Sequence, residues 1–332
     1  FGEKPMYIWK KNNRFYFASE IKGLSAISNE KPKVNKNHLL RNLVNGYKSI
    51  YKTRETFFEG INELPPGTCL KINSDGTSKY LDYWKPNLVE NTNLSYSDAV
   101  NMIKEAVIDA TKLRMRSDDP IAFCMSGGVD SNTLISIASK ILGCEVHGFT
   151  IVNTDSRYEE QSLVDQSVKE LGIKHHSVKL EKHNFLKNLS SLINHHDSPI
   201  YTISYYLHWQ LMRSIADRGF KVTISGTAAD ELFTGYFDHH NLFLYEISKN
   251  KQLHQKALSD WNKYQKNIVR NPYLKDPNLY INNPDFRDHN FMNNDLFASC
   301  ILDEWKESFT ENKYVKSLLR NRMLNEMFVE TV

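Results

Sequence analysis

This sequence contains few cysteines, no long hydrophobic run and little net charge. The cysteines among its 332 residues show no Cys-x-x-Cys pair and no spacing typical of a metal site. They are Cys69, Cys124, Cys144 and Cys300. We therefore expect reduced, structural thiols in a cytoplasmic protein. No apolar run approaches membrane-spanning length and no signal peptide is visible, so we expect no membrane partner.

The charge balance excludes a further class of partner. Lysine and arginine together number 42 against 39 acidic residues, a net charge of +3. Such a balance gives no electrostatic reason to expect a nucleic-acid partner. A hydrophobic content of 40% and a charged content of 24% are typical of globular proteins. The length suggests about two domains.

The first part of the chain predicts antiparallel hairpins. Residues 6–9 and 14–18 are rich in β-forming side chains and are joined by a turn that contains asparagine. A second hairpin is predicted over 68–72 and 79–84. The polar stretch 86–93 is the predicted linker.

After Ser95 the sequence takes up helical spacing and then alternates between strands and helices. The predicted strands cover residues 120–125, 146–151, 175–180 and 221–225, and the predicted helices cover 131–142, 159–171, 184–194 and 205–217. Such a series predicts a parallel sheet covered by helices on both faces. Ligands bind beyond the carboxyl ends of the strands in such sheets, and Ser126 and Ser225 both fall at that edge.

The hexapeptide Ser-Gly-Gly-Val-Asp-Ser, which begins at Ser126, joins a buried strand to a helix. Gly127 and Gly128 let the backbone approach a phosphate closely, because no Cβ intervenes. The N–H groups of the next helical turn point outward, with the positive end of the helix dipole behind them. Ser131 adds a hydroxyl and Asp130 a carboxylate suited to Mg²⁺. An ordinary turn has a similar composition, but the strand before and the helix after favour a phosphate site.

A second loop, from Ser225 to Tyr236, follows the last predicted strand. Its Asp230 and Glu231 open a predicted helix at the same sheet edge as Asp130. Two carboxylates that face one polyphosphate are able to share a Mg²⁺ ion. Helix capping by the acidic pair is the alternative.

Together these segments resemble the asparagine synthetase (glutamine-hydrolysing) family of the ATP-pyrophosphatase, or PP-loop, superfamily. That family carries Ser-Gly-Gly-x-Asp-Ser and, further on, Ser-Gly-Glu-Gly-x-Asp-Glu-x-x-x-Gly-Tyr. The match extends through Phe1-Gly-Glu-Lys-Pro5, Leu64-Pro-Pro-Gly67, Tyr83-Trp-Lys-Pro86 and Arg320-Asn-Arg-Met-Leu-Asn-Glu326.

The resemblance implies an α/β fold of two parts. Residues 95–332 would form an asparagine synthetase-type, parallel-sheet ATP-pyrophosphatase (adenine nucleotide alpha hydrolase-like) domain. Residues 1–86 would be the C-terminal part of a class II glutamine amidotransferase domain, a partial antiparallel glutaminase-type β sheet.

The implied activity is that of an ATP-dependent, amide-forming carbon–nitrogen ligase of asparagine biosynthesis. Such enzymes activate a carboxylate as an acyl-adenylate, release pyrophosphate and let ammonia derived from glutamine attack. The implied cofactors are ATP and Mg²⁺, with Asp130 and Asp230 as metal ligands. The implied partners are a small carboxylate, aspartate by default, with glutamine or ammonia, and a second copy in a homodimer. The implied ATP-binding residues are Cys124, Ser126, Gly127, Gly128, Asp130, Ser131, Ile151, Ser225 and Gly226.

The sequence departs from the family pattern in three ways. The glutaminase's N-terminal nucleophilic Cys and the synthetase's catalytic Lys have no counterpart here, so we expect an internal stretch of a longer polypeptide that lacks the glutaminase active site. Thr227 and Ala228 replace the family's Glu-Gly. A threonine hydroxyl is no base near neutral pH. The catalytic residues therefore stay unassigned and the acceptor acid stays open.

Hypotheses from two other classes remain. A tRNA-modifying PP-loop enzyme is disfavoured by the lack of paired cysteines and the weak positive charge. A non-catalytic nucleotide-binding or assembly module is suggested by Thr227.

The charged loop from Asp155 to Glu160 is either a solvated helix cap or faces the nucleotide. Arg320 and Arg322 are predicted as helix-surface charges, with phosphate contact as the alternative. The pairs His175-His176, His195-His196 and His239-His240 are predicted in core or surface positions rather than as metal ligands. The alternative for His176 is a position near the site, because its strand register lies close to it.

Overall fold

The computed structural model describes residues 2–89, 93–152, 160–180, 183–290, 294–305, 307 and 310–330. Its contacts divide the chain into two compact units. Unit 1 comprises Phe1–Leu88 with Ala228–Val332, and unit 2 comprises Val89–Thr227. The predicted domains, 1–86 and 95–332, differ from these units because residues 228–332 group with the first part of the chain. That domain division remains a prediction.

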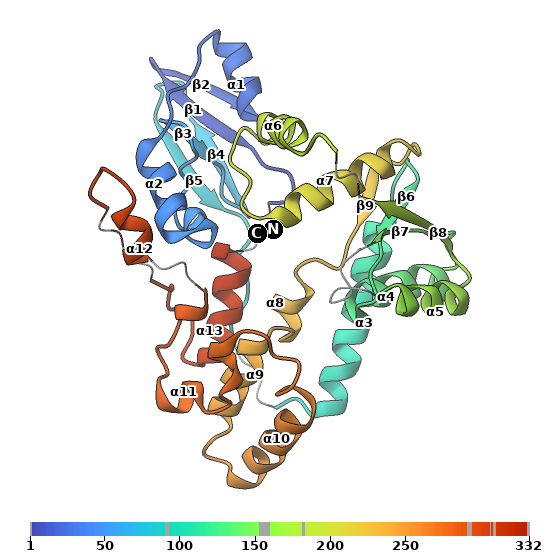
Figure 1. Cartoon of the computed structure of the whole chain (residues 1–332). Helices are drawn as coiled ribbons and strands as arrows, with labels where there is room; N and C mark the ends of the chain where they lie inside the picture. The colour runs from blue at the N-terminus through green and yellow to red at the C-terminus, as the bar shows by residue number, and fades with distance from the viewer. Residues whose placement is uncertain are drawn as a thin grey trace. The chain divides into compact units, whose positions relative to one another are not determined.

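Unit 2 is built on a parallel sheet with the strand order β8-β7-β6-β9. The strands are β6 (Ile121–Cys124), β7 (His147–Val152), β8 (Lys174–Lys179) and β9 (Val222–Ile224). The helices are α3 (Tyr96–Arg114), α4 (Val129–Ser136), α5 (Gln161–Leu171), α6 (Phe185–His196) and α7 (Ile203–Ala216) (Figure 1). The predicted strand–helix series is therefore confirmed. A π-helical segment, η2 (Ile137–Ile141), continues α4.

Apolar side chains cover both faces of this sheet. Successive residues of a strand point to opposite faces, and Phe123 packs with Ile135 of α4 and Val164 of α5. Its neighbour Ala122 packs on the other face with Leu211 of α7. The α/β class is confirmed. Because both faces of the sheet are covered, the ends of the strands are its uncovered parts.

Local signals in the sequence set the ends of several helices. The Ser95 side chain caps α3 by accepting a hydrogen bond from the N–H of Asp98, 3.2 Å away. Gly172 ends α5 in the left-handed conformation, at a φ of 65°. Both positions were predicted as helix boundaries.

Unit 1 contains an antiparallel sheet with the order β2-β1-β3 and a separate hairpin of β4 and β5. The elements are β1 (Tyr7–Lys11), β2 (Arg14–Ala18), α1 (Ile21–Ser28), α2 (Lys36–Asn45), η1 (Tyr47–Lys52), β3 (Ile61–Glu63), β4 (Thr68–Ile72) and β5 (Ser78–Asp82). Both predicted hairpins are confirmed. The first turns through Asn12 and Asn13, whose φ angles of 48° and 59° are in the left-handed region that asparagine tolerates.

The remainder of unit 1 is helical. Its elements are α8 (Ala229–Phe233), α9 (Phe237–Glu246), α10 (Lys251–Tyr264), η4 (Pro272–Lys275), α11 (Leu279–Asn282), η5 (Asp288–Asn290), α12 (Asn294–Ser299), α13 (Leu318–Asn325) and η6 (Glu326–Glu330). Leu244, Trp261 and Leu274 form a buried core. Within the described ranges, the structure has no helix both long and apolar enough to cross a membrane.

Candidate functional site

The loop between β6 and α4 lies at the carboxyl edge of the parallel sheet. β6 is a central strand, flanked by β7 and β9. The chain leaves it at Met125, whose N–H donates to the Phe149 carbonyl at 2.8 Å. α4 then begins at Val129 without a side-chain cap. The sequence thus places the N-terminus of a helix at the edge where parallel sheets bind ligands.

Short polar side chains hold this loop in shape. The N–H of Ser126 donates to Ser131 Oγ at 3.2 Å, and the N–H of Gly128 donates to Ser126 Oγ at 3.1 Å. The Asn132 side-chain amide donates to the carbonyls of Ser126 and Gly128, at 3.0 and 2.7 Å. The hydroxyls predicted as phosphate donors therefore also determine the conformation of the loop.

The loop after β9 passes directly against this helix N-terminus. A Cβ on Gly226 would lie 2.9 Å from both the Asp130 Cβ and the Ser131 backbone nitrogen. Such distances are below van der Waals contact, so only glycine fits here. Ser225 and Thr227 share a hydrogen bond between their hydroxyl oxygens at 2.7 Å. The two serine–glycine segments that the sequence singled out are therefore neighbours.

These segments line a pocket of about 690 Å³ that lies entirely in unit 2. Of the predicted ATP-binding residues, all but Gly127 line it. The lining residues are Cys124, Met125, Ser126, Gly128, Asp130, Ser131, Thr150, Ile151, Val152, Glu160, Gln161, Leu207, His208, Leu211, Met212, Ser225, Gly226 and Thr227. The volume falls in the range usual for small-molecule and cofactor sites.

The charged side chains of this lining are acidic. Asp130 and Glu160 contribute carboxylates, and the described lining includes no lysine or arginine. Burial raises the pKa of the Cys124 thiol to about 11, so it stays neutral at physiological pH. A polyphosphate in this pocket would meet these carboxylates, and a bound cation would offset the repulsion.

One wall of the pocket was not predicted from the sequence. α7 contributes Leu207, His208, Leu211 and Met212. They recur at helical spacing and form one stripe, but the same pattern equally predicts an ordinary core-facing helix. His176, considered as a neighbour of the site, does not line the pocket.

The charged residues that the sequence singled out lie in different parts of the structure. Asp130 lies in the first turn of α4 and lines the pocket. Asp230 belongs to unit 1, in the first turn of α8, so its sharing of a metal ion with Asp130 stays a prediction. Asp155, Arg157 and Glu159 lie outside the described residues. Glu160 is the N-cap residue of α5.

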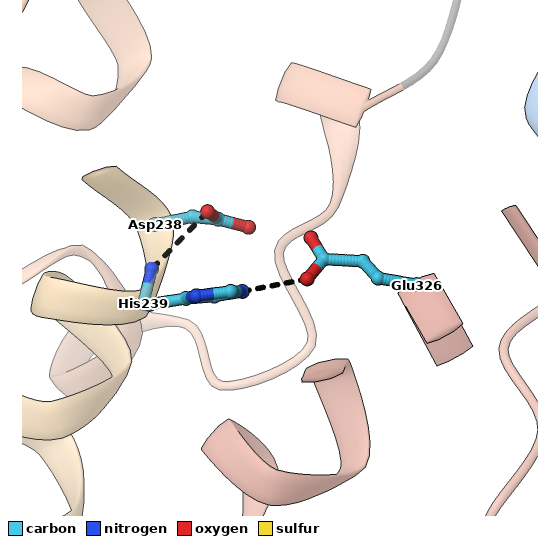
Figure 2. Close-up of side chains that lie close together, drawn as sticks. All are labelled: Asp238, His239 and Glu326. Carbon is cyan, nitrogen blue, oxygen red and sulfur yellow. Dashed lines mark hydrogen bonds and ion pairs between the residues drawn. The ribbon is translucent and has the colours of Figure 1, made fainter. Parts of the chain in front are cut away.

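A buried cluster in unit 1 brings together groups that are typical metal ligands. Asp238 and His239 come from α9, and His239 Nε2 contacts the Glu326 carboxylate at 2.7 Å (Figure 2). However, the Arg322 guanidinium forms ion pairs with Asp238 at 3.3 Å and with Glu326 at 2.9 Å. The positive charge that balances these carboxylates is thus supplied by an arginine side chain.

The prediction that Arg322 is a helix-surface charge was wrong, because its side chain is completely buried. Its guanidinium also donates to both oxygens of Glu330, at 2.6 and 2.7 Å, and to Glu311 at 2.9 Å. Burial alone would lower the pKa of Arg322, but the hydrogen bonds from Arg322 to Glu330 and the surrounding carboxylates raise it well above its usual value. The i,i+4 spacing of Arg322 and Glu326 could have indicated one of these pairs, but nothing near Arg322 in the sequence indicates Asp238.

Comparison with known proteins agrees with this architecture. The profile of the asparagine synthase family matches residues 102–324, which is most of the chain. The chain belongs to the asparagine synthase family. A glutamine amidotransferase domain profile matches residues 1–84, the segment that contains both antiparallel hairpins. The resemblance inferred from the two motifs is therefore confirmed.

Individual relatives are distant and longer than this chain. Asparagine synthetase [glutamine-hydrolyzing] 1 of Bacillus subtilis is 27% identical over 238 residues, which cover 71% of this chain and 36% of that protein. A putative asparagine synthetase of Methanocaldococcus jannaschii is 27% identical over 250 residues, covering 72% and 46%. Amidase chyE of Penicillium rubens is 25% identical over 198 residues, covering 54% and 30%. The chain thus spans less than half the length of each of these relatives.

Among solved structures, an NH3-dependent NAD synthetase from Campylobacter jejuni is similar over 41% of this chain and 60% of its own, at 16% identity. The TM-score of 0.28 is too low for this likeness to carry an argument.

Proposed function

We propose that this chain carries the synthetase site of an ATP-dependent, amide-forming ligase. The site would bind ATP in the pocket of unit 2 and transfer AMP to a substrate carboxylate, with release of pyrophosphate. Ammonia, derived from glutamine or free, would then displace AMP and leave an amide. Family membership supports the reaction class, and aspartate is the default acceptor by that membership.

The convergence of the two serine–glycine loops on one pocket carries this proposal. Residues around Ser126 and Ser225 are far apart in sequence, yet Gly226 approaches the helix N-terminus that follows Ser126 to within van der Waals contact. Backbone N–H groups at a helix N-terminus suit phosphate oxygens. The apolar residues of α7 provide a surface for the flat adenine ring.

The donor set fits a magnesium ion beside the phosphates. Asp130 offers a carboxylate and the neighbouring serines offer hydroxyls, which are the hard oxygen ligands that Mg²⁺ prefers. When bound, the ion would offset the charge of the departing pyrophosphate. Asp130 is its proposed ligand in unit 2, and Asp230 remains the second ligand predicted from the family pattern.

The residues of the chain act mainly by binding and orientation. The hydrogen bonds among Ser126, Gly128 and Ser131 fix the loop before substrate arrives, so little reorganisation opposes phosphate binding. The Thr227 hydroxyl is hydrogen-bonded to Ser225 and supplies no base near neutral pH. Thr227 would therefore not be the group that takes a proton from the attacking ammonia.

Pyrophosphate release tests the proposed function. The chain is incubated with ATP, Mg²⁺, ammonia and one carboxylic acid at a time, aspartate first. We expect pyrophosphate to appear only with the acid that the site accepts. ATP binding without pyrophosphate release for any acid would favour the non-catalytic module instead.

The substitution Asp130→Asn tests the metal assignment. It keeps the size of the side chain but removes its charge, so Mg²⁺-dependent ATP binding should weaken about tenfold or more. Titration calorimetry with and without Mg²⁺ measures this difference. Wild-type Mg²⁺ dependence in the variant would contradict the role of Asp130.

A further inference from the structure

A carboxylate already accepts a hydrogen bond from one of the backbone amides of the loop. Glu160 Oε2 accepts a hydrogen bond from the N–H of Gly127, and the distance is 2.8 Å. The contact joins residues separated by 33 positions in the sequence. Glu160 is the N-cap residue of α5, and its own carbonyl accepts from the N–H groups of Leu163 and Val164. The backbone of Glu160 is thus fixed by its helix while its side chain reaches across to the loop.

The packing around Gly127 keeps the two segments close. A Cβ on Gly127 would lie 3.1 Å from the Glu160 Cβ and 3.0 Å from the Leu163 Cβ. The glycine therefore allows the N-terminus of α5 to lie directly against the loop. A larger residue would have to push the start of α5 away by a few tenths of an ångström.

A carboxylate and a phosphate bind a backbone amide in the same way. Each offers a negatively charged oxygen that accepts a charge-assisted hydrogen bond. One N–H cannot satisfy both at full strength. A polyphosphate that uses the Gly127 amide must displace Glu160, and the two anions repel each other while both are near the loop.

We propose that Glu160 competes with the polyphosphate for the Gly127 amide and so limits the affinity of the loop for phosphates that carry no divalent cation. This inference rests on the proposed function, because it assumes that the pocket binds the polyphosphate of ATP. The carboxylate serves as a stand-in anion that keeps the amide paired. A bound cation reduces the repulsion between this carboxylate and the incoming phosphates, so the metal complex is the form that binds well.

Pyrophosphate binding to the wild type and to Glu160→Gln tests the proposal. The glutamine has the same length and keeps an acceptor oxygen, but it lacks the charge. We expect the variant to bind Mg²⁺-pyrophosphate about three- to tenfold more tightly, because a neutral hydrogen bond is easier to displace than a charged one. The affinity for metal-free pyrophosphate should increase by a larger factor than the affinity for the Mg²⁺ complex. Titration calorimetry measures both affinities.

Two further variants control for structure and for net charge. Glu160→Asp keeps the charge but shortens the reach, and should tighten binding less than Glu160→Gln does. Glu170→Gln removes an exposed carboxylate from the other end of α5 and should leave both affinities unchanged. The amide resonance of Gly127 in a ¹⁵N-labelled protein reports the contact directly, and it should move upfield in Glu160→Gln.

The outcomes separate the inference from the proposed function. Equal or weaker pyrophosphate binding by Glu160→Gln overturns the competition and makes Glu160 a residue that positions the loop. If Glu170→Gln tightens pyrophosphate binding by the same factor, the competition is overturned as well, because net charge then explains the effect. If none of the proteins binds pyrophosphate or ATP, the proposed function is overturned, and this inference fails with it.

Discussion

A missing side chain at Gly226 allows two distant loops to meet. The loop after β9 lies so close to α4 that any Cβ at this position would overlap the Asp130 side chain and the Ser131 backbone. Backbone atoms cannot move aside as the end of a long side chain can. The phosphate site therefore depends on a contact in which glycine contributes only by being small.

The substitution Gly226→Ala should disrupt this contact. We expect a loss of stability of about 1–3 kcal/mol from overpacking, together with loss of detectable ATP binding as the start of α4 shifts. Denaturant unfolding and titration calorimetry measure the two effects. Gly143→Asn is the matched control, because the space around Gly143 is open and asparagine tolerates its φ of 66°. ATP binding at wild-type strength in Gly226→Ala would show that the loops do not need this approach.

The Cys124 thiol should resist alkylation. Since burial raises its pKa to about 11, about one thiol in a thousand is ionised at pH 8, and the thiolate is the reactive form. Its reaction with iodoacetamide should accelerate about tenfold for each pH unit between 8 and 10. Exposed Cys69 and Cys300 provide internal references in the same mass spectrum. Modification of Cys124 at pH 8 as fast as that of Cys69 would contradict its burial.

At the scale of elements, α13 and η6 are held to the rest of unit 1 by charge. Arg322 pairs with Asp238 of α9, and Lys48 of η1 pairs with Glu330 of η6 at 3.1 Å. Burial alone would raise the pKa of Asp238, but the hydrogen bond from His289 and the nearby positive charges lower it far below its usual range. The hydrogen bond from Arg322 likewise outweighs burial and lowers the pKa of Glu330. Arg322 thus contributes to the lowered pKa of both carboxylates, together with His289 at Asp238 and Lys48 at Glu330.

The substitution Arg322→Met should destabilise unit 1 by about 3–5 kcal/mol at pH 7, because it leaves buried carboxylates without their counter-charge. In the wild type, depressed carboxylate pKa values stabilise the fold above the unfolded pKa of about 4, and this stabilisation is lost as the pH falls further. The difference between variant and wild type should therefore narrow as the pH falls below about 4.

Urea unfolding followed by tryptophan fluorescence, to which the buried Trp9 and Trp261 of unit 1 contribute, measures this difference at each pH. Lys316→Met changes an exposed cation just before α13 and should stay within about 0.5 kcal/mol of the wild type. A pH-independent loss in Arg322→Met would indicate lost packing rather than lost charge.

The same elements show what the sequence could predict. β6, α4 and the loop between them follow from local rules, since a buried strand, two glycines and a helix start are all written in adjacent residues. β3 escaped prediction because Ile61–Glu63 is too short to show an alternating pattern. The ion pair of Arg322 with Glu326 follows an i,i+4 pattern that the sequence could have shown, but no local pattern records its pairing with Asp238 of α9. The α7 wall of the pocket was missed because apolar lining and apolar core have the same composition.

At the scale of the whole molecule, the pocket belongs to one compact unit. Each residue that lines it lies between Cys124 and Thr227, within Val89–Thr227. The chain enters this unit after Leu88 and leaves it before Ala228. Ligand binding in this pocket should therefore stabilise unit 2 directly, by an amount that follows from the affinity and the ligand concentration.

Hydrogen exchange resolves this expectation by segment. Saturating Mg²⁺-ATP should slow amide exchange in peptides that cover residues 124–131, 150–152 and 225–227, because these segments line the pocket. At a ligand concentration of about 100 times Kd the slowing should approach a hundredfold for amides that exchange by opening of unit 2. Peptides from β1 and β2 contribute nothing to the lining and serve as the reference. Equal slowing in β1, β2 and the pocket segments would contradict a nucleotide site confined to unit 2, and no slowing in the pocket segments would place ATP elsewhere on the chain.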